Sequence, residues 1–200
     1  MAEQRPENLV ERLRARDAEA FNELVRLFHG SVYRLAFRLL RHADDAQEAA
    51  QDTFLAAYQG IAGFQERAGV RTWLLSIAYR KAVDRLKRRT EESHVASGML
   101  DEEALWKIAR NVDDLTDWGD NPEQTFGYQQ LNDHLHAALD KLPVEARAVF
   151  ELRDLQGLST REAAEVLGIA EGAVRVRLHR VRQFLMRELQ ALFGERGIRK

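Results

Sequence analysis

The chain has 200 residues, of which 45% are hydrophobic and 31% are charged, a balance typical of a folded globular protein rather than a disordered one. No run of about 18 apolar residues occurs and the N-terminus is charged, so the sequence predicts neither membrane insertion nor a secretory signal. The absence of cysteine excludes disulfides and thiolate metal sites, and it fits a reducing, cytoplasmic location.

The net charge of −2 conceals strong segregation along the chain. Residues 71–89 and residues 171–187 are basic, whereas residues 91–126 are predominantly acidic. Two basic patches therefore flank an acidic segment. This pattern matters more for binding to a charged partner than the sum of the charges does.

Apolar residues recur at helical spacing and only three prolines interrupt the chain, so we predict an all-α fold. Helices are expected over residues 18–41, 45–59 and 70–89, then again from residue 129, with a new helix from Pro143 to Asp154. Residues 91–128 lose the apolar periodicity and are predicted to form an acidic linker with at most a short helix around 102–109. The prediction is therefore two small helical domains, 1–90 and 129–200, joined by the linker 91–128.

The second domain carries the pattern of a helix-turn-helix between Leu142 and Leu189. Ser159 and Glu162 have the spacing of a capping box at the start of a short helix. Gly168 can adopt the left-handed conformation that ends this helix, and a longer helix begins near Glu171. In such a motif the second helix enters the major groove of DNA.

On this second helix an apolar stripe is predicted to face the core and a basic stripe to face outward. The apolar stripe consists of Val174, Leu178, Val181 and Leu185. The candidate DNA contacts on and beside the outward stripe are Arg175, Val176, Arg177, His179 and Arg180. Arginine can bond guanine in pairs and can also meet phosphates. An amphipathic helix with a solvated basic face is the alternative; the capping box and turn favour DNA contact.

The helix over residues 45–59 is predicted to have an acidic outer face with one leucine at its centre. That face consists of Asp45, Glu48, Gln51, Asp52 and Leu55, opposite a buried side of Ala46, Ala50, Phe54, Ala57 and Tyr58. An acidic face with an apolar centre suits a positively charged partner surface. A merely solvated acidic helix would show the same pattern.

The helix over residues 70–89 places aromatic and cationic groups on one side, opposite an inward stripe of Leu75, Ala78, Ala82 and Leu86. The candidate residues are Trp73, Arg80, Asp84 and Lys87, with Phe64 in the preceding loop. Such a surface suits single-stranded DNA, because bases stack on rings while phosphates meet cations. The loop 63–69 is a candidate wall for a pocket that holds an unstacked base. The alternative is that Trp73 packs in the core and the cations face solvent.

These stretches resemble two regions of bacterial sigma factors. Residues 142–169 resemble region 4 and residues 172–180 its −35 recognition helix; residues 45–55 resemble region 2.2, and residues 71–78 with 84–89 resemble regions 2.3 and 2.4. The combination is similar to the extracytoplasmic-function class, which keeps only regions 2 and 4. Arg80, Ala170 and Ala173 depart from the family pattern, where an asparagine and two hydroxyl residues are usual.

The resemblance implies a specificity subunit of RNA polymerase with no catalytic residues, cofactor or metal. Its implied partners are core polymerase, through the β′ coiled coil and the β flap, promoter DNA at the −10 and −35 elements, and an anti-sigma factor; the free chain is expected to be a monomer. Two alternatives stay open. One is a stand-alone repressor or activator that uses the same helix-turn-helix, and the other is a sigma mimic that sequesters an anti-sigma factor.

Overall fold

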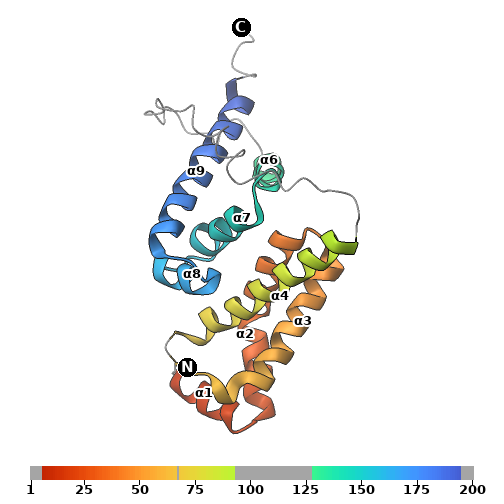
Figure 1. Cartoon of the computed structure of the whole chain (residues 1–200), viewed down its shortest axis with the longest axis vertical. Coiled ribbons are helices and arrows are strands. Elements are labelled where there is room, and N and C mark those ends of the chain that lie inside the picture. The colour runs from red at the N-terminus through yellow and green to blue at the C-terminus, as the bar shows by residue number, and fades with distance from the viewer. Residues whose placement is uncertain (1–5, 67, 93–127, 195–200) are drawn as a thin grey trace.

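The computed structural model describes residues 6–66, 68–92 and 128–194. In chain order its elements are α1 (Pro6–Arg14), α2 (Ala18–Leu40), α3 (Ala43–Gly60), the 3₁₀ turn η1 (Ile61–Gly63), α4 (Val70–Glu92), α6 (Tyr128–Asp140), α7 (Val144–Phe150), the π turn η3 (Glu151–Leu155), α8 (Thr160–Leu167) and α9 (Glu171–Gly194). Within these ranges there is no strand, which confirms the predicted all-α class. Figure 1 shows α1–α4 as one group of helices and α6–α9 as another.

The first group is a bundle in which α2, α3 and α4 pack against one another. Its core includes the fully buried side chains of Leu24, Leu35, Leu39, Leu74 and Leu75. On α3 the inward positions are mostly alanines, which allows the neighbouring helices to approach closely. The predicted inward stripe of α4 is also confirmed, since its two alanines and Leu75 are completely buried and Leu86 is partly buried.

Two features of this bundle differ from the sequence prediction. Tyr58 was expected in the core but is 38% exposed, because it lies at the edge of the bundle with its ring edge-on to Phe21 and beneath the guanidinium of Arg16. Helix α1 was not predicted, because its stretch of sequence is dominated by charged residues. It is anchored by the buried side chains of Leu9, Val10 and Leu13.

The second group forms the predicted helix-turn-helix from α8 and α9. The capping box is present: Glu162 N donates to Ser159 Oγ at 3.2 Å, and Ser159 N donates to the Glu162 carboxylate at 2.8 Å. Gly168 ends α8 with a φ of 67°, a conformation that favours glycine. The helix predicted over 143–154 instead ends at Phe150 and continues as the single π turn η3.

The two groups touch each other along α2 and α4 on one side and α7, η3 and α8 on the other. Helix α4 runs to Glu92, beyond the predicted end at Arg89. The short helix expected around 102–109, with most of the linker 91–128, lies outside the described residues. The boundaries 1–90, 91–128 and 129–200 therefore stay a prediction.

Candidate nucleic-acid interface

Helix α9 has one buried and one exposed side, as predicted. Its inward side chains Val174, Leu178, Val181 and Leu185 are no more than 6% exposed. Arg175, His179 and Arg180 are exposed, and Val176, an apolar residue, is 50% exposed in their midst. Val176 is thus an apolar side chain exposed to water among cations. Such a side chain is suited to contact a thymine methyl or a similar apolar group in a DNA groove.

The arginines beside this stripe have structural contacts within the chain. Arg182 donates to both carboxylate oxygens of Asp154, at 2.9 and 2.5 Å, which ties α9 to the end of η3 and raises the pKa of the arginine. Arg177 is partly buried where α9 faces α4. Within the stripe itself, Arg175 contacts Glu171 of the same helix at 3.5 Å and is still exposed.

The outward side of α4 carries Arg80, Asp84 and Lys87 in exposed positions, as expected. Trp73 is only partly buried, and its ring lies 4.8 Å from that of Phe64. Phe64 itself is 6% exposed, so its ring supports Trp73 from the protein side and is not presented to solvent. Phe64 is therefore a core residue, whereas Trp73 is partly buried and lies at the boundary between the core and the surface.

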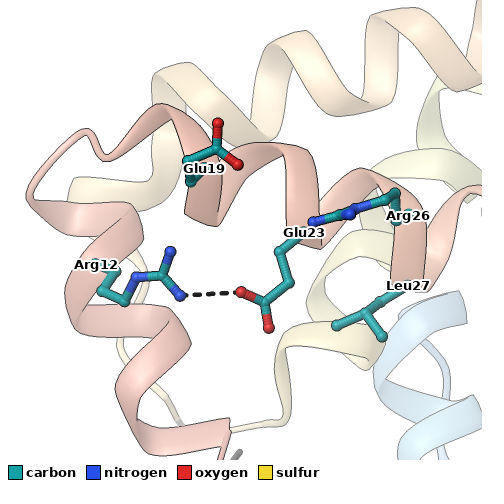
Figure 2. Close-up of a pocket in the computed structure, with 5 residues that line it drawn as sticks. All are labelled: Arg12, Glu19, Glu23, Arg26 and Leu27. Atoms are coloured by element: carbon teal, nitrogen blue, oxygen red, sulfur yellow. Dashed lines mark hydrogen bonds and ion pairs between the residues drawn. The ribbon is translucent and has the colours of Figure 1, made fainter.

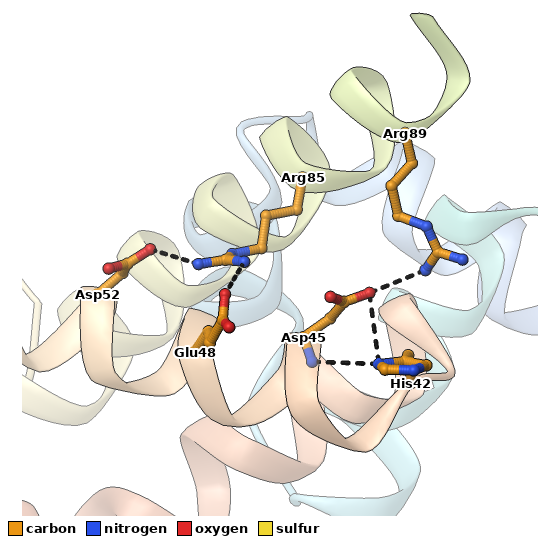
Figure 3. A network of polar contacts seen from close by, with 6 residues as sticks. All are labelled: His42, Asp45, Glu48, Asp52, Arg85 and Arg89. Atoms are coloured by element: carbon orange, nitrogen blue, oxygen red, sulfur yellow. Dashed lines mark hydrogen bonds and ion pairs between the residues drawn. The ribbon is translucent and has the colours of Figure 1, made fainter. Parts of the chain in front are cut away.

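The acidic face of α3 is exposed at Gln51 and at Leu55, the latter 57% exposed. Its carboxylates, however, are paired with arginines of α4 (Figure 3). Arg85 bridges Glu48 at 2.7 Å and Asp52 at 2.8 Å, and Arg89 contacts Asp45 at 3.0 Å. We call these three ion pairs the ion-pair ladder. The sequence did not predict it, because the sequence shows that both helices are charged but not that these charges face each other.

A separate hollow of about 400 Å³ lies between α1 and the start of α2 (Figure 2). It is lined by Arg12, Glu19, Glu23, Arg26 and Leu27. Arg12 contacts Glu23 at 2.9 Å and Asp17 at 2.8 Å, so its charge is already compensated inside the protein. Among the described residues there is no group of His, Cys, Asp and Glu suited to a metal ion, and none of the described helices is long and apolar enough to cross a membrane.

The sequence matches the family models of sigma-70 region 2 over residues 24–92 and sigma-70 region 4 over residues 133–185. It is 34% identical to the ECF RNA polymerase sigma factor SigM of Mycobacterium tuberculosis, over 93% of this chain and 85% of SigM. It is 28% identical to the ECF RNA polymerase sigma factor SigW of Bacillus subtilis, over 92% of this chain and 96% of SigW. The chain belongs to the ECF class of RNA polymerase sigma factors.

A solved structure of another protein, CnrH in complex with the cytosolic domain of CnrY, is similar to this sigma factor. The TM-score is 0.63 and the identity 26%, over 92% of this chain and 96% of CnrH. The sigma factor directs promoter-specific initiation of transcription. Its region 2 match runs from α2 to the end of α4, and its region 4 match from α6 into α9. A stand-alone helix-turn-helix regulator has no counterpart of region 2, which decides against that alternative.

Proposed function

We propose that this sigma factor divides promoter recognition and polymerase docking among three helices. Helix α9 reads the −35 element as duplex DNA, the outward side of α4 binds the melted −10 strand, and α3 docks on core RNA polymerase. The observation that carries the proposal is the two-sided character of α9, in which Val174 is fully buried while its second neighbour Val176 is 50% exposed. Only one side of this helix is available to a major groove.

For the −35 element, the proposed contacts are Arg175, Val176, His179 and Arg180, with Arg177 on a flank. The exposed arginines supply paired donors for guanine or single contacts to phosphate. For the −10 element, Trp73 offers a stacking face, Phe64 holds it from behind at 4.8 Å, and Arg80 and Lys87 supply positive charge. Asp84 lies on the same exposed side and suits an exocyclic amine of a base.

For docking, the apolar centre of α3 is the strongest feature. Leu55 is 57% exposed on the acidic outer face of α3, with Gln51 one turn before it. We assign this face to the β′ coiled coil of polymerase, and region 4 to the β flap, on the strength of the family resemblance. Asp45, Glu48 and Asp52 belong to the same face, but a basic partner must share them with Arg85 and Arg89.

The proposal includes the remaining properties that the family implies. The sigma factor acts as a non-catalytic subunit in the cytoplasm, where core polymerase and the chromosome are, and it is a monomer before it binds polymerase. An anti-sigma factor is its proposed inhibitory partner. The complex of CnrH with the cytosolic domain of CnrY supports the idea that a chain of this shape can be bound by a second polypeptide.

The test is run-off transcription with purified core polymerase and fragmented genomic DNA of the source organism. Discrete transcripts are expected only when the sigma factor is added. Leu55→Asp places a charge at the apolar centre of the docking face without touching an ion pair, so it should abolish the transcripts together with polymerase binding. The matched control is Leu27→Asp on α2, because Leu27 is similarly exposed, at 59%, but lies away from all three proposed surfaces.

The DNA contacts are tested by Arg175→Ala combined with Arg180→Ala. This variant should bind polymerase normally but lose transcription from promoters that depend on a −35 element. The control removes two exposed arginines of α2, Arg26 and Arg34, and should keep activity. Full activity of the α9 variant would contradict the DNA assignment and favour a sigma mimic that sequesters an anti-sigma factor.

A further inference from the structure

Helix α1 ends next to the loop that leads from η1 into α4. The helix packs against α2 and η1, and it is anchored there by the buried side chains of Leu9, Val10 and Leu13. This packing brings Arg14, the last residue of α1, close to the chain that leaves η1. Arg14 lies before residues 24–92, the part of the chain that matches sigma-70 region 2, so its role does not follow from that match.

The guanidinium of Arg14 contacts this loop at two points. Its Nη2 donates to the backbone oxygen of Phe64 at 2.7 Å. Its Nη1 contacts the Glu66 carboxylate, also at 2.7 Å. Because a guanidinium is planar and its donors are fixed relative to one another, a contact at two points fixes both partners. We call these two contacts the Arg14 clamp.

Residues 64–66 belong to no helix, so their conformation depends on such contacts. The backbone N–H of Phe64 donates to the Ile61 oxygen at 3.1 Å, but the Phe64 oxygen accepts from a side chain of another element. Glu66 has a φ of 54°. Residues other than glycine rarely adopt this left-handed conformation, and surrounding contacts must maintain it. The Arg14 clamp supplies a contact at both ends of this segment.

The conformation of the segment matters because Phe64 supports Trp73. The Phe64 side chain is 6% exposed, and its ring centroid lies 4.8 Å from that of Trp73. A β-carbon added to Gly60 would lie 3.8 Å from the Trp73 ring, so this ring is also close to the end of α3. A displaced Phe64 would change the angle or depth of the ring that is proposed to stack on a base. A binding side chain gives its full affinity only when the residues behind it hold it in place.

We propose that Arg14 is a positioning residue for recognition of the melted −10 strand. It holds the backbone of Phe64, and Phe64 holds the Trp73 ring ready to stack on an unpaired base. The inference rests on the proposed function, which assigns this surface to the strand. Arg14 does not touch the DNA in this role, since its charge is compensated by Glu66. Without the clamp, the apparent affinity falls by the fraction of molecules in which the ring is in place.

The test measures how the complex of core polymerase and the full-length sigma factor binds single-stranded DNA. The probes are oligomers with the −10 sequence of a promoter mapped by run-off transcription, one intact and the others each lacking one base. In the parent, loss of the base that stacks on Trp73 should weaken binding. Arg14→Ala should weaken binding of the intact oligomer by about two- to tenfold, as expected for one lost hydrogen bond. It should not change binding of the oligomer that lacks this base.

Two further variants distinguish positioning from a direct contact between Arg14 and a phosphate. Glu66→Gln removes the counter-ion of Arg14 and makes this surface more positive. If Arg14 met a phosphate, every oligomer would then bind more tightly, whereas loss of the clamp should weaken binding of the intact oligomer only. Arg14→Lys keeps the charge and can donate to the Phe64 oxygen, but it cannot hold both partners with fixed geometry. It should restore part of the affinity that Arg14→Ala loses.

The matched control is Arg16→Asn. Arg16 is exposed and donates to the backbone oxygen of Tyr58 at 2.9 Å, so it joins the same part of the chain to α3 and not to residues 64–66. Its φ is 61°, a conformation that asparagine tolerates. This variant loses an arginine close to the clamp and should bind all oligomers like the parent.

Hydrogen exchange of the free sigma factor gives a reading that needs no DNA. The Phe64 amide should exchange faster in Arg14→Ala than in the parent, while the amides of α2 keep their rates. The positioning role is overturned if this rate is unchanged, or if Arg14→Ala and Glu66→Gln bind the intact oligomer like the parent or weaken all oligomers equally. A parent complex that binds no oligomer contradicts the proposed −10 surface, and the positioning role with it. Failure of the proposed function is thus seen in the parent, and failure of this inference alone is seen only in the variants.

Discussion

Ala170 stands immediately before α9, at the position where a hydroxyl side chain usually caps a helix. Its carbonyl accepts from the N–H groups of Ala173, at 2.9 Å, and Val174, at 3.2 Å, but its methyl group cannot accept from the first turn. We expect Ala170→Ser to stabilise the protein by about 1 kcal/mol, because a serine oxygen would satisfy an N–H at the helix start. Thermal unfolding followed by circular dichroism measures the gain. Ala137→Ser, at an exposed position inside α6, is the control and should give no gain.

Glu162 makes the stability of the sigma factor depend on pH. Hydrogen bonds from the Ser159 hydroxyl and backbone N–H, with a smaller contribution from Thr72, lower its pKa below the ordinary value of 4.5. The stabilisation is therefore complete at neutral pH and is lost as the pH falls from that value through the lower pKa of the folded state. In Glu162→Gln the free energy of unfolding should fall less steeply as the pH is lowered through the acid range. An unchanged acid limb, or an equal effect of Glu165→Gln on the same helix, would contradict this role.

The ion-pair ladder joins α3 to α4 and is expected to stabilise the packing of these two helices. Arg85 holds Glu48 and Asp52, which lie one turn apart, and its side chain is 24% exposed (Figure 3). We expect Arg85→Gln to lower the free energy of unfolding by about 1 kcal/mol or less at low salt, and by almost nothing at 1 M salt. Arg88→Gln, which removes the same charge from an exposed position of α4, is the control and should have a smaller effect at low salt.

The helices show which parts of the structure the apolar periodicity of the sequence can predict. It predicted α2 almost to the residue, and all four predicted inward residues of α9 are buried, because burial repeats with the turn of a helix. It did not identify Phe184, which is also buried on α9. Periodicity identifies the inward face but not what an outward charge meets, so the pairing of the α3 carboxylates with Arg85 and Arg89 could not be predicted. Phe64 illustrates a further limit: in a loop no repeat distinguishes a core side chain from one that meets a base.

The whole molecule depends on contacts that no local pattern contains. Arg71 and Gln156 are 85 residues apart in the chain, Arg38 and Glu151 are 113 apart, and Ser31 and Gln156 are 125 apart. The sequence predicted two domains and a linker, and each domain taken alone has its own pattern of apolar residues. These contacts join polar residues that look like ordinary surface positions in their own helices, so the sequence did not predict them.

The buried ion pair of Arg38 on α2 and Glu151 on η3, 3.2 Å apart, gives a prediction for the molecule as a whole. Glu151→Gln leaves the Arg38 guanidinium buried without its counter-ion, so it should destabilise the sigma factor strongly, by about 3–5 kcal/mol. Arg38→Met combined with Glu151→Met removes both charges and keeps apolar volume in place, so it should cost much less than the sum of its two single variants. Urea unfolding of the parent, the singles and the double variant measures this coupling. Strict additivity would show that the two domains do not share this ion pair in solution, whereas strong coupling would show that the ion pair contributes to the stability of both.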